Sequence, residues 1–210
     1  MSVESATAHG ASGAPAAPGA PERRARLDHE TVVLAAEVLV DRDGYDVLSM
    51  TLLAAELDTR VSTLYNHVTN LEDLRAEVQV RAMALMGRHV QRAAMGRSGT
   101  DGIEALCHQL RDFARTYPHR YAAITRAPID RDGFFAAAGE VIEALGVMVR
   151  STGLPEDDIL STGMAVFSAL HGFVSLEVSG YFGGIDDLER VFEQVVRGAV
   201  AAAVLDSPRP

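Results

Sequence analysis

The chain has 210 residues, of which 48% are hydrophobic and 6% aromatic, and its formal net charge is −10. This is enough apolar material for an ordinary soluble core, in one large domain or in a small domain and a larger one. A single cysteine excludes an intramolecular disulfide framework, and there is neither a run of about 20 apolar residues that would span a bilayer nor a secretory signal. We therefore expect a soluble cytoplasmic protein with no membrane segment. All nineteen basic residues are Arg, which indicates a high-GC bacterial source.

The N-terminal segment is poor in bulky apolar side chains. Residues 1–21 consist mostly of Ala, Gly, Pro and Ser, and they cannot bury enough surface to offset the entropy lost on ordering. We expect them to be a disordered tail. A short basic arm with Arg23, Arg24 and Arg26 follows.

Capping residues and apolar spacing predict four helices in the next part of the chain. Asp28, Ser49 and Asn70 each precede apolar residues at helical intervals, so each can cap the helix that follows it. The helices are expected between Asp28 and Gly44, from Ser49 to Leu57, at 62–68 and at about 71–95.

Further helices are expected in the remainder, separated by Pro and Gly residues. Their predicted ranges are 103–117, 119–127, 133–151, 156–180 and 185–205. No stretch alternates long enough to require a strand. The sequence therefore predicts an all-α protein.

Residues 48–68 carry the most informative pattern. Two short helices joined by a tight turn can hold the second helix in the major groove of DNA while the first braces it. Leu57, Leu64 and Val68 are expected to pack inward. The side chains left on the outer face are of types that contact base edges or phosphates, namely Arg60, Val61, Ser62, Thr63, Tyr65, Asn66 and His67.

The same stretch resembles a known family signature. Residues 63–68 (TLYNHV), with Asn70 and Leu74, are similar to the TLYxHV-x-N-x-x-x-L signature of the tetracycline-repressor (TetR) family, and residues 49–54 are similar to its second helix. The resemblance is close over residues 28–78. It implies an all-helical homodimer that binds double-stranded DNA through a helix-turn-helix domain, here 22–69, and a small molecule through a larger helical domain that also dimerises, here 70–206. It adds Thr51 to the DNA-facing residues above.

Three positions depart from the family pattern. Asp58 stands where the family prefers Gly, and Asp tolerates the left-handed conformation better than most residues. Thr59 replaces a buried Val, and Leu71 replaces a Lys that often contacts phosphate. Residues 22–80 also hold six Arg against twelve acidic residues, so non-specific DNA affinity should be low. The arm at Arg23, Arg24 and Arg26 then either reaches the minor groove or is a solvated tail.

Two weaker motifs occur in the C-terminal part. Residues 117–121 (YPHRY) and residues 170–173 (LHGF), followed by 180–182 (GYF), resemble the turn and the W-H-G segment of one TetR branch, with Leu in place of Trp. Apolar stripes on the last two helices are expected either to form a four-helix bundle with a second subunit or to belong to an intramolecular core. The stripes are Phe167, Leu170, Val174 and Val178, then Leu188, Phe192, Val195, Val196 and Ala199.

Aromatic and Met side chains in this part are candidates for a small-molecule pocket, although at helical spacing they can equally be core. They are Phe113, Tyr117, Tyr121, Met148, Met164, Phe167 and His171. We find no His or Cys pair at metal-ligand spacing, no phosphate loop and no nucleophile motif, so no metal, no cofactor and no enzyme is expected. The sequence predicts a DNA-binding transcriptional regulator, a repressor released by a small, mainly apolar effector. The alternative is a helical ligand-binding or interaction protein with little DNA affinity.

Overall fold

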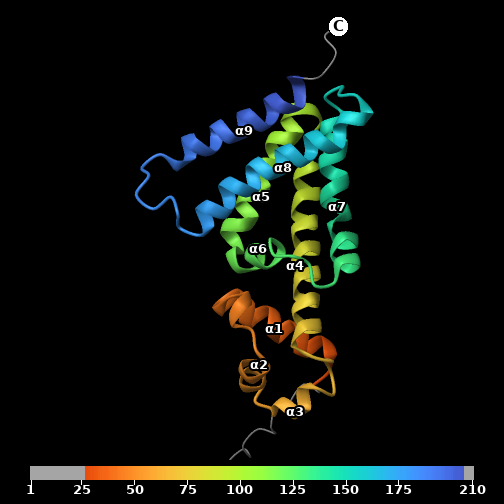
Figure 1. Cartoon of the computed structure of the whole chain (residues 1–210), viewed down its shortest axis with the longest axis vertical. Coiled ribbons are helices and arrows are strands. Elements are labelled where there is room, and N and C mark those ends of the chain that lie inside the picture. The colour runs from red at the N-terminus through yellow and green to blue at the C-terminus, as the bar shows by residue number, and fades with distance from the viewer. Residues whose placement is uncertain (1–26, 206–210) are drawn as a thin grey trace, which may run out of the picture.

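The computed structural model describes residues 27–205. The expected tail at 1–21 and the arginines at 23, 24 and 26 lie outside the described residues. Figure 1 shows an elongated molecule in which one long helix, α4 (Leu71–Ala94), runs from a small group of helices at one end into a larger helical body. Residues 27–205 contain helices and no strand, so the all-α prediction is confirmed.

The helix bounds follow the predicted ranges to within a few residues. The small end contains α1 (His29–Asp43), a 3-10 helix η1 (Tyr45–Val47), α2 (Met50–Glu56) and α3 (Val61–Leu64). The larger body contains α5 (Gly99–Thr116), α6 (Pro118–Ile124), α7 (Arg131–Arg150), α8 (Glu156–Val178) and α9 (Leu188–Leu205). The main differences are an earlier start for α5, a later start for α9 and a much shorter α3.

The predicted caps are confirmed. The Asp28 carboxylate accepts a hydrogen bond from the Thr31 amide at 2.8 Å, and the Asn70 side chain accepts one from the Asp73 amide at 2.8 Å. The Ser49 hydroxyl accepts one from the Leu52 amide at 3.3 Å. Each cap satisfies an amide that a helix N-terminus leaves without an intrahelical partner.

The helices enclose two hydrophobic cores that share α4. The first core lies among α1, α2, α3 and the start of α4, and its last α4 residue is Val78. The second begins one turn later at Ala82 and extends through α5 to α9. Ala123 of α6 belongs to the first core, although its helix lies in the larger body. Two helices, α4 and α6, therefore belong to both parts of the molecule.

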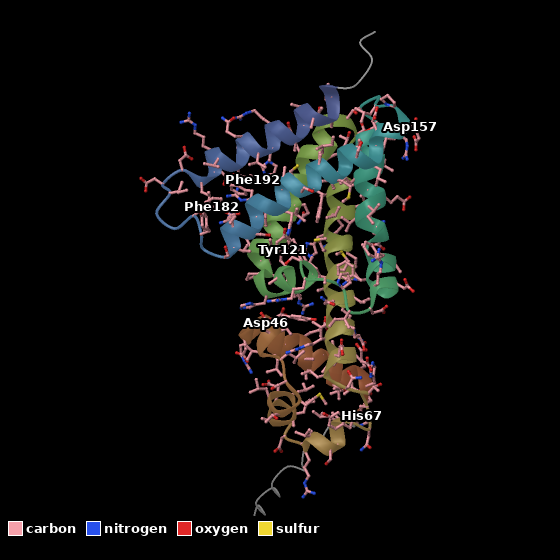
Figure 2. All side chains as sticks on the ribbon, in the orientation of Figure 1. Asp46, His67, Tyr121, Asp157, Phe182 and Phe192 are labelled. Carbon is pink, nitrogen blue, oxygen red and sulfur yellow. The ribbon has the colours of Figure 1, made fainter. Side chains whose placement is uncertain are left out.

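The apolar stripes predicted for a subunit interface are mostly core of this chain. Leu170 and Val174 of α8 and Phe192 and Val196 of α9 are buried between α5, α8 and α9. Figure 2 shows Phe192 where α8 and α9 run beside each other. The intramolecular alternative is correct for these residues, because α5 occupies the side on which a second subunit was expected.

A buried ion cluster that the sequence analysis missed fastens α8 and α9 to α5. Arg111 of α5, 6% exposed, forms salt bridges to Glu177 at 2.9 Å and to Glu189 at 2.7 Å. Its guanidinium also lies over the Phe192 ring, 4.2 Å from the centroid. The Glu177 hydrogen bonds raise the pKa of Arg111, so the cluster stays charged.

Helix α8 is long and apolar enough to cross a membrane by length and composition, with a mean hydropathy of 1.6 over its most apolar window. That finding departs from the expectation that no such stretch exists. The helix has a different place in this fold, because its buried face packs on α5, α7 and α9.

Candidate DNA interface and ligand cavity

The two short helices at the narrow end form a helix-turn-helix with a shortened second helix. We refer to residues 61–67 as the recognition segment. Its α-helical part ends at Leu64 rather than at 68, and tight bonds continue it, from Asn66 N to Thr63 O at 3.1 Å and from His67 N to Leu64 O at 2.8 Å. In the turn before it, Asp58 has φ 45°, the left-handed conformation expected for the residue that replaces Gly.

Burial divides the recognition segment into an inner and an outer side. Leu64 is fully buried and Val68 nearly so, whereas Leu57 is half-buried. The predicted DNA-facing residues are all exposed or half-buried. Thr51, Arg60, Ser62, Tyr65 and Asn66 are exposed, and Val61, Thr63 and His67 are half-buried. Figure 1 places α3 at the extremity of the molecule, and Figure 2 shows His67 there, so this side is accessible to a duplex.

Arg60 differs from the other arginines between residues 27 and 80. Arg42 is held by Asp43 and Glu56, and Arg75 donates to the Leu48 carbonyl at 2.8 Å. The Arg60 side chain forms no hydrogen bond or ion pair with any residue in the described part of the chain. It stands at the start of α3, where a cation with free donors can contact a base edge or a phosphate.

A cavity of about 620 Å³ lies in the larger body, which is within the size range of small-molecule sites. Its walls come from α4, α6, α7 and α8, and its lining is predominantly apolar. The charged lining residues Glu143, Arg150 and Glu156 are exposed at its edge, where Arg150 and Glu156 form a salt bridge at 3.1 Å.

The structure brings four of the seven predicted ligand-binding residues to this cavity. Tyr121, Met164, Phe167 and His171 line it. The whole α7 wall, which includes Phe134, Phe135 and Ile142, was missed. The apolar spacing of helix 133–151 was the available signal.

Phe113, Tyr117 and Met148, also predicted as pocket residues, do not line this cavity. The Phe113 ring is buried against His89 and Tyr117, with centroids 5.5 and 5.3 Å away. Met148 packs on Gly102, where an added Cβ would meet its sulfur at 2.1 Å. These side chains fill the contacts between α5 and its neighbours instead of a hollow.

One polar pair faces the apolar cavity. The Tyr121 hydroxyl and His171 Nδ1 are 2.8 Å apart, and the Phe167 ring stacks on the imidazole at 5.7 Å between centroids. Burial raises the pKa of Tyr121 to about 12 and lowers the pKa of His171. At neutral pH the phenol therefore keeps its proton and the imidazole is uncharged. If the Tyr121 hydroxyl donates to Nδ1, the other imidazole proton is on Nε2, where the Ser175 hydroxyl oxygen at 3.4 Å or a ligand oxygen can accept it.

Helix α6 connects the cavity to the helix-turn-helix. Tyr121 and Ile124 of α6 line the cavity, whereas the neighbouring Arg120 forms salt bridges to Asp41 at 2.6 Å and to Glu37 at 3.1 Å on α1. The Gln79 amide on α4 also donates to the Ala123 carbonyl at 3.0 Å. A shift of α6 must therefore disturb contacts on both sides.

Comparison with known proteins agrees with this architecture. Residues 103–199 match the family model described as a tetracyclin repressor-like C-terminal domain. The HTH-type transcriptional regulator Rv0681 of Mycobacterium tuberculosis is 35% identical over 83% of this chain and 80% of its own.

Solved structures show the same fold at lower identity. The putative regulatory protein SCO4313 has a TM-score of 0.68 at 21% identity, covering 81% of this chain and 94% of its own. BioQ with its double-stranded DNA operator has a TM-score of 0.56 at 24% identity, covering 84% and 99%. ActR of Streptomyces coelicolor in complex with (S)-DNPA has a TM-score of 0.60 at 21% identity, covering 88% and 100%.

The chain belongs to the TetR family of helix-turn-helix transcriptional regulators. Members of this family are transcription regulators and not enzymes.

Proposed function

We propose that this regulator is a repressor that binds a palindromic operator as a homodimer and is released by a small, mainly apolar molecule. The observation that carries the proposal is that α4 and α6 contribute residues to both hydrophobic cores. These two helices therefore join the recognition segment to the cavity. The DNA complex of BioQ and the ligand complex of ActR support both halves of the proposal by analogy of fold.

The proposed response passes through α6. A ligand that pushes on Tyr121 or Ile124 moves the helix that carries Arg120, and the Arg120 salt bridges then pull on α1. In a two-fold dimer the recognition segments must lie about 34–36 Å apart to enter successive major grooves, so a small tilt is sufficient to break the match. The coupling free energy needed between the two sites is about 1–3 kcal/mol. Because coupling is reciprocal, DNA must lower the affinity for the ligand by the same factor by which the ligand lowers the affinity for DNA.

A face with many small and apolar exposed residues on α8 and α9 supports the homodimer. Small residues allow close approach of helices across a two-fold axis. These residues are Ala165, Ser168, Ala169, Gly172 and Leu176 on α8, and Val191, Gly198, Ala201 and Val204 on α9, with Arg190, Gln194 and Arg197 beside them on α9.

The cavity chemistry supports a small, uncharged effector with one hydrogen-bonding group. A charged ligand would lose most of its hydration on entering the cavity, and the apolar walls would offer no partner to compensate for that loss. The Tyr121–His171 pair offers one polar contact. We expect the regulator to act in the cytoplasm, where its DNA target is.

The test separates the cavity from the DNA interface. Gly163 lines the cavity, and an added Cβ there would only touch Leu145 Cδ2 at 3.6 Å, so Gly163→Leu should fit and fill the hollow. Gly139→Leu is the matched control, because it lies exposed on α7 with nothing within 4 Å of its Cβ. We expect the neutral fluorophore Nile red to bind wild type and Gly139→Leu but not Gly163→Leu.

Compounds that displace Nile red are then added to a complex of the protein with a duplex selected from a random-sequence pool. They should release wild type and Gly139→Leu, while Gly163→Leu stays bound. Equal release of all three proteins would place the effector site elsewhere.

The alternative, a ligand-binding protein with little DNA affinity, is favoured by the excess of acidic residues in 22–80. A gel-retardation assay at low salt decides between the two. Failure to select any duplex, with Nile red still bound, would establish the alternative.

A further inference from the structure

His29, at the first position of α1, contacts two acceptors from different parts of the small domain. One ring nitrogen, Nδ1, is 2.8 Å from the carbonyl oxygen of His67, the last residue of the recognition segment. The other, Nε2, is 2.9 Å from a carboxylate oxygen of Glu77 on α4. The imidazole therefore bridges the end of the recognition segment to the long helix.

The two contacts together select one protonation state. A neutral imidazole has a single N–H, so one of its nitrogens would present a lone pair to an oxygen lone pair. Only the imidazolium donates to both acceptors. Rotating the ring by 180° does not change this conclusion, because an oxygen acceptor lies at each end.

The charged groups around the ring favour the imidazolium on balance. Glu77 on α4 and Glu30 on α1 are acidic neighbours, and Arg81 on α4 opposes them while it is itself bound to both carboxylates. The recognition segment contributes the His67 carbonyl. This carbonyl hydrogen bond, with the Glu77 carboxylate, raises the pKa of His29 despite some desolvation.

The His67 carbonyl needs such a partner. It closes a segment with only one α-helical turn, and no backbone amide in the described residues donates to it. A cation with an N–H donor at the end of a helical segment satisfies the carbonyl and complements the segment's dipole. Without it, Tyr65 to His67 are held from one side only, by Leu64 and Val68 in the core.

We propose that the His29 imidazolium is a positioning group for DNA binding, which holds the end of the recognition segment on α4 so that DNA affinity falls as His29 loses its proton. The role rests on the proposed DNA-binding function. It is fully present below about pH 6.5, the ordinary value for His, and it is lost as pH rises through the higher folded-state value. The recognition segment then samples more orientations, and the fraction competent to bind DNA decreases.

The first experiment measures the protonation state without DNA. The full chain, labelled with ¹⁵N-histidine, is titrated by long-range ¹H–¹⁵N NMR, and the His29 signals are assigned by their absence in His29→Gln. We expect both His29 nitrogens to carry protons below about pH 6.5, with a titration midpoint above the ordinary value for His. Glu77→Gln should lower that midpoint, and Glu72→Gln, which removes a charge from the exposed start of the same helix, should not. A midpoint at or below 6.5, or equal effects of the two variants, overturns the proposal.

The second experiment measures affinity for a duplex selected from a random-sequence pool, by fluorescence anisotropy between pH 6 and 8.5 at fixed salt. The DNA affinity of wild type should decrease about threefold to tenfold from pH 6 to 8.5, which is the range expected for loss of a partly exposed, charge-assisted hydrogen bond. His29→Gln should bind DNA weakly at every pH. His29→Arg, which is permanently charged and has several donors, should bind DNA tightly, and its affinity should not change with pH. All three are also measured in a His67→Gln background, because the His67 side chain lies on the proposed DNA face and would otherwise obscure the contribution of His29.

The outcomes separate the two hypotheses. If His29→Gln keeps the wild-type pH slope, the positioning role is wrong while DNA binding stands. If the protein binds no duplex at any pH, both the proposed function and this role are overturned.

Discussion

Replacing Arg111 tests whether one buried charge holds the last two helices to the rest of the body. The change is Arg111→Met, which keeps most of the side-chain volume over the Phe192 ring but removes the guanidinium. Glu177, 12% exposed, then remains as a carboxylate without its cation. Breaking a buried pair from one side costs about 3–5 kcal/mol, because the remaining charge is uncompensated.

The other salt bridge of the cluster contributes much less. Glu189 is 62% exposed, so water can replace its contact, and exposed pairs are worth about 0–1 kcal/mol. We expect Glu189→Gln to lower the unfolding free energy by less than about 1 kcal/mol. The double variant Arg111→Met with Glu177→Leu should recover most of the Arg111→Met loss, because no unpaired charge remains.

The assay is urea unfolding followed by circular dichroism, with a calorimetric melting temperature at one fixed protein concentration, since an oligomer's stability depends on concentration. For a chain of this size, about 3–5 kcal/mol corresponds to a decrease of about 6–20 °C in Tm. A loss below 1 kcal/mol for Arg111→Met, or a double variant as unstable as the single one, would refute the reasoning.

The remaining predictions concern DNA, assembly and pH. Arg60→Ala should cost about 1–3 kcal/mol on a selected duplex and little on random DNA; equal losses would make its contact a phosphate contact. Deleting residues 1–21 should leave DNA affinity unchanged. Deleting 1–26 should make the slope of log affinity against log salt concentration shallower by up to about three; an unchanged slope would mean that the arm does not contact DNA. Ala169→Asp should give a folded monomer by light scattering, and a persistent dimer would exclude the α8–α9 face. Because burial lowers the pKa of His171, its neutral form favours folding above about pH 6.5 and this contribution is lost on acidification. His171→Gln should therefore lose less stability than wild type between pH 7 and 5.

Local signals in the sequence were sufficient to locate the helices and to separate the buried from the outward side chains of residues 48–68. Caps such as Asp28 and Asn70 act within three residues, so the sequence alone locates them. The left-handed Asp58 was also predictable, since it occupies the Gly position of a turn. The length of α3 was not, because the tighter bonds after Leu64 depend on how the segment rests on the core.

The cavity and the ion cluster depend on pairings that periodicity cannot reveal. Helical spacing shows that Phe113 and Met148 lie on apolar faces, but whether a neighbouring helix fills that space is decided in three dimensions. Arg111 and Glu177 are 66 positions apart. A charged residue within an apolar stripe of a predicted helix was the one available sign of a buried ion pair.

Ala123 has a consequence for how such regulators can be recombined. Its side chain is fully buried in the core of the small end, where α6 contacts α1, η1 and α4, and Gln79 binds the backbone of its helix. Residues 27–78 taken alone would therefore have a hole in the core where α6 had been. A chimera that joins this DNA-reading end to the sensor of another family member should fold only if the segment 118–124 travels with it or is replaced by one of the same shape. The boundary between the small end with the helix-turn-helix and the larger body is thus a surface between helices and not a point along the chain.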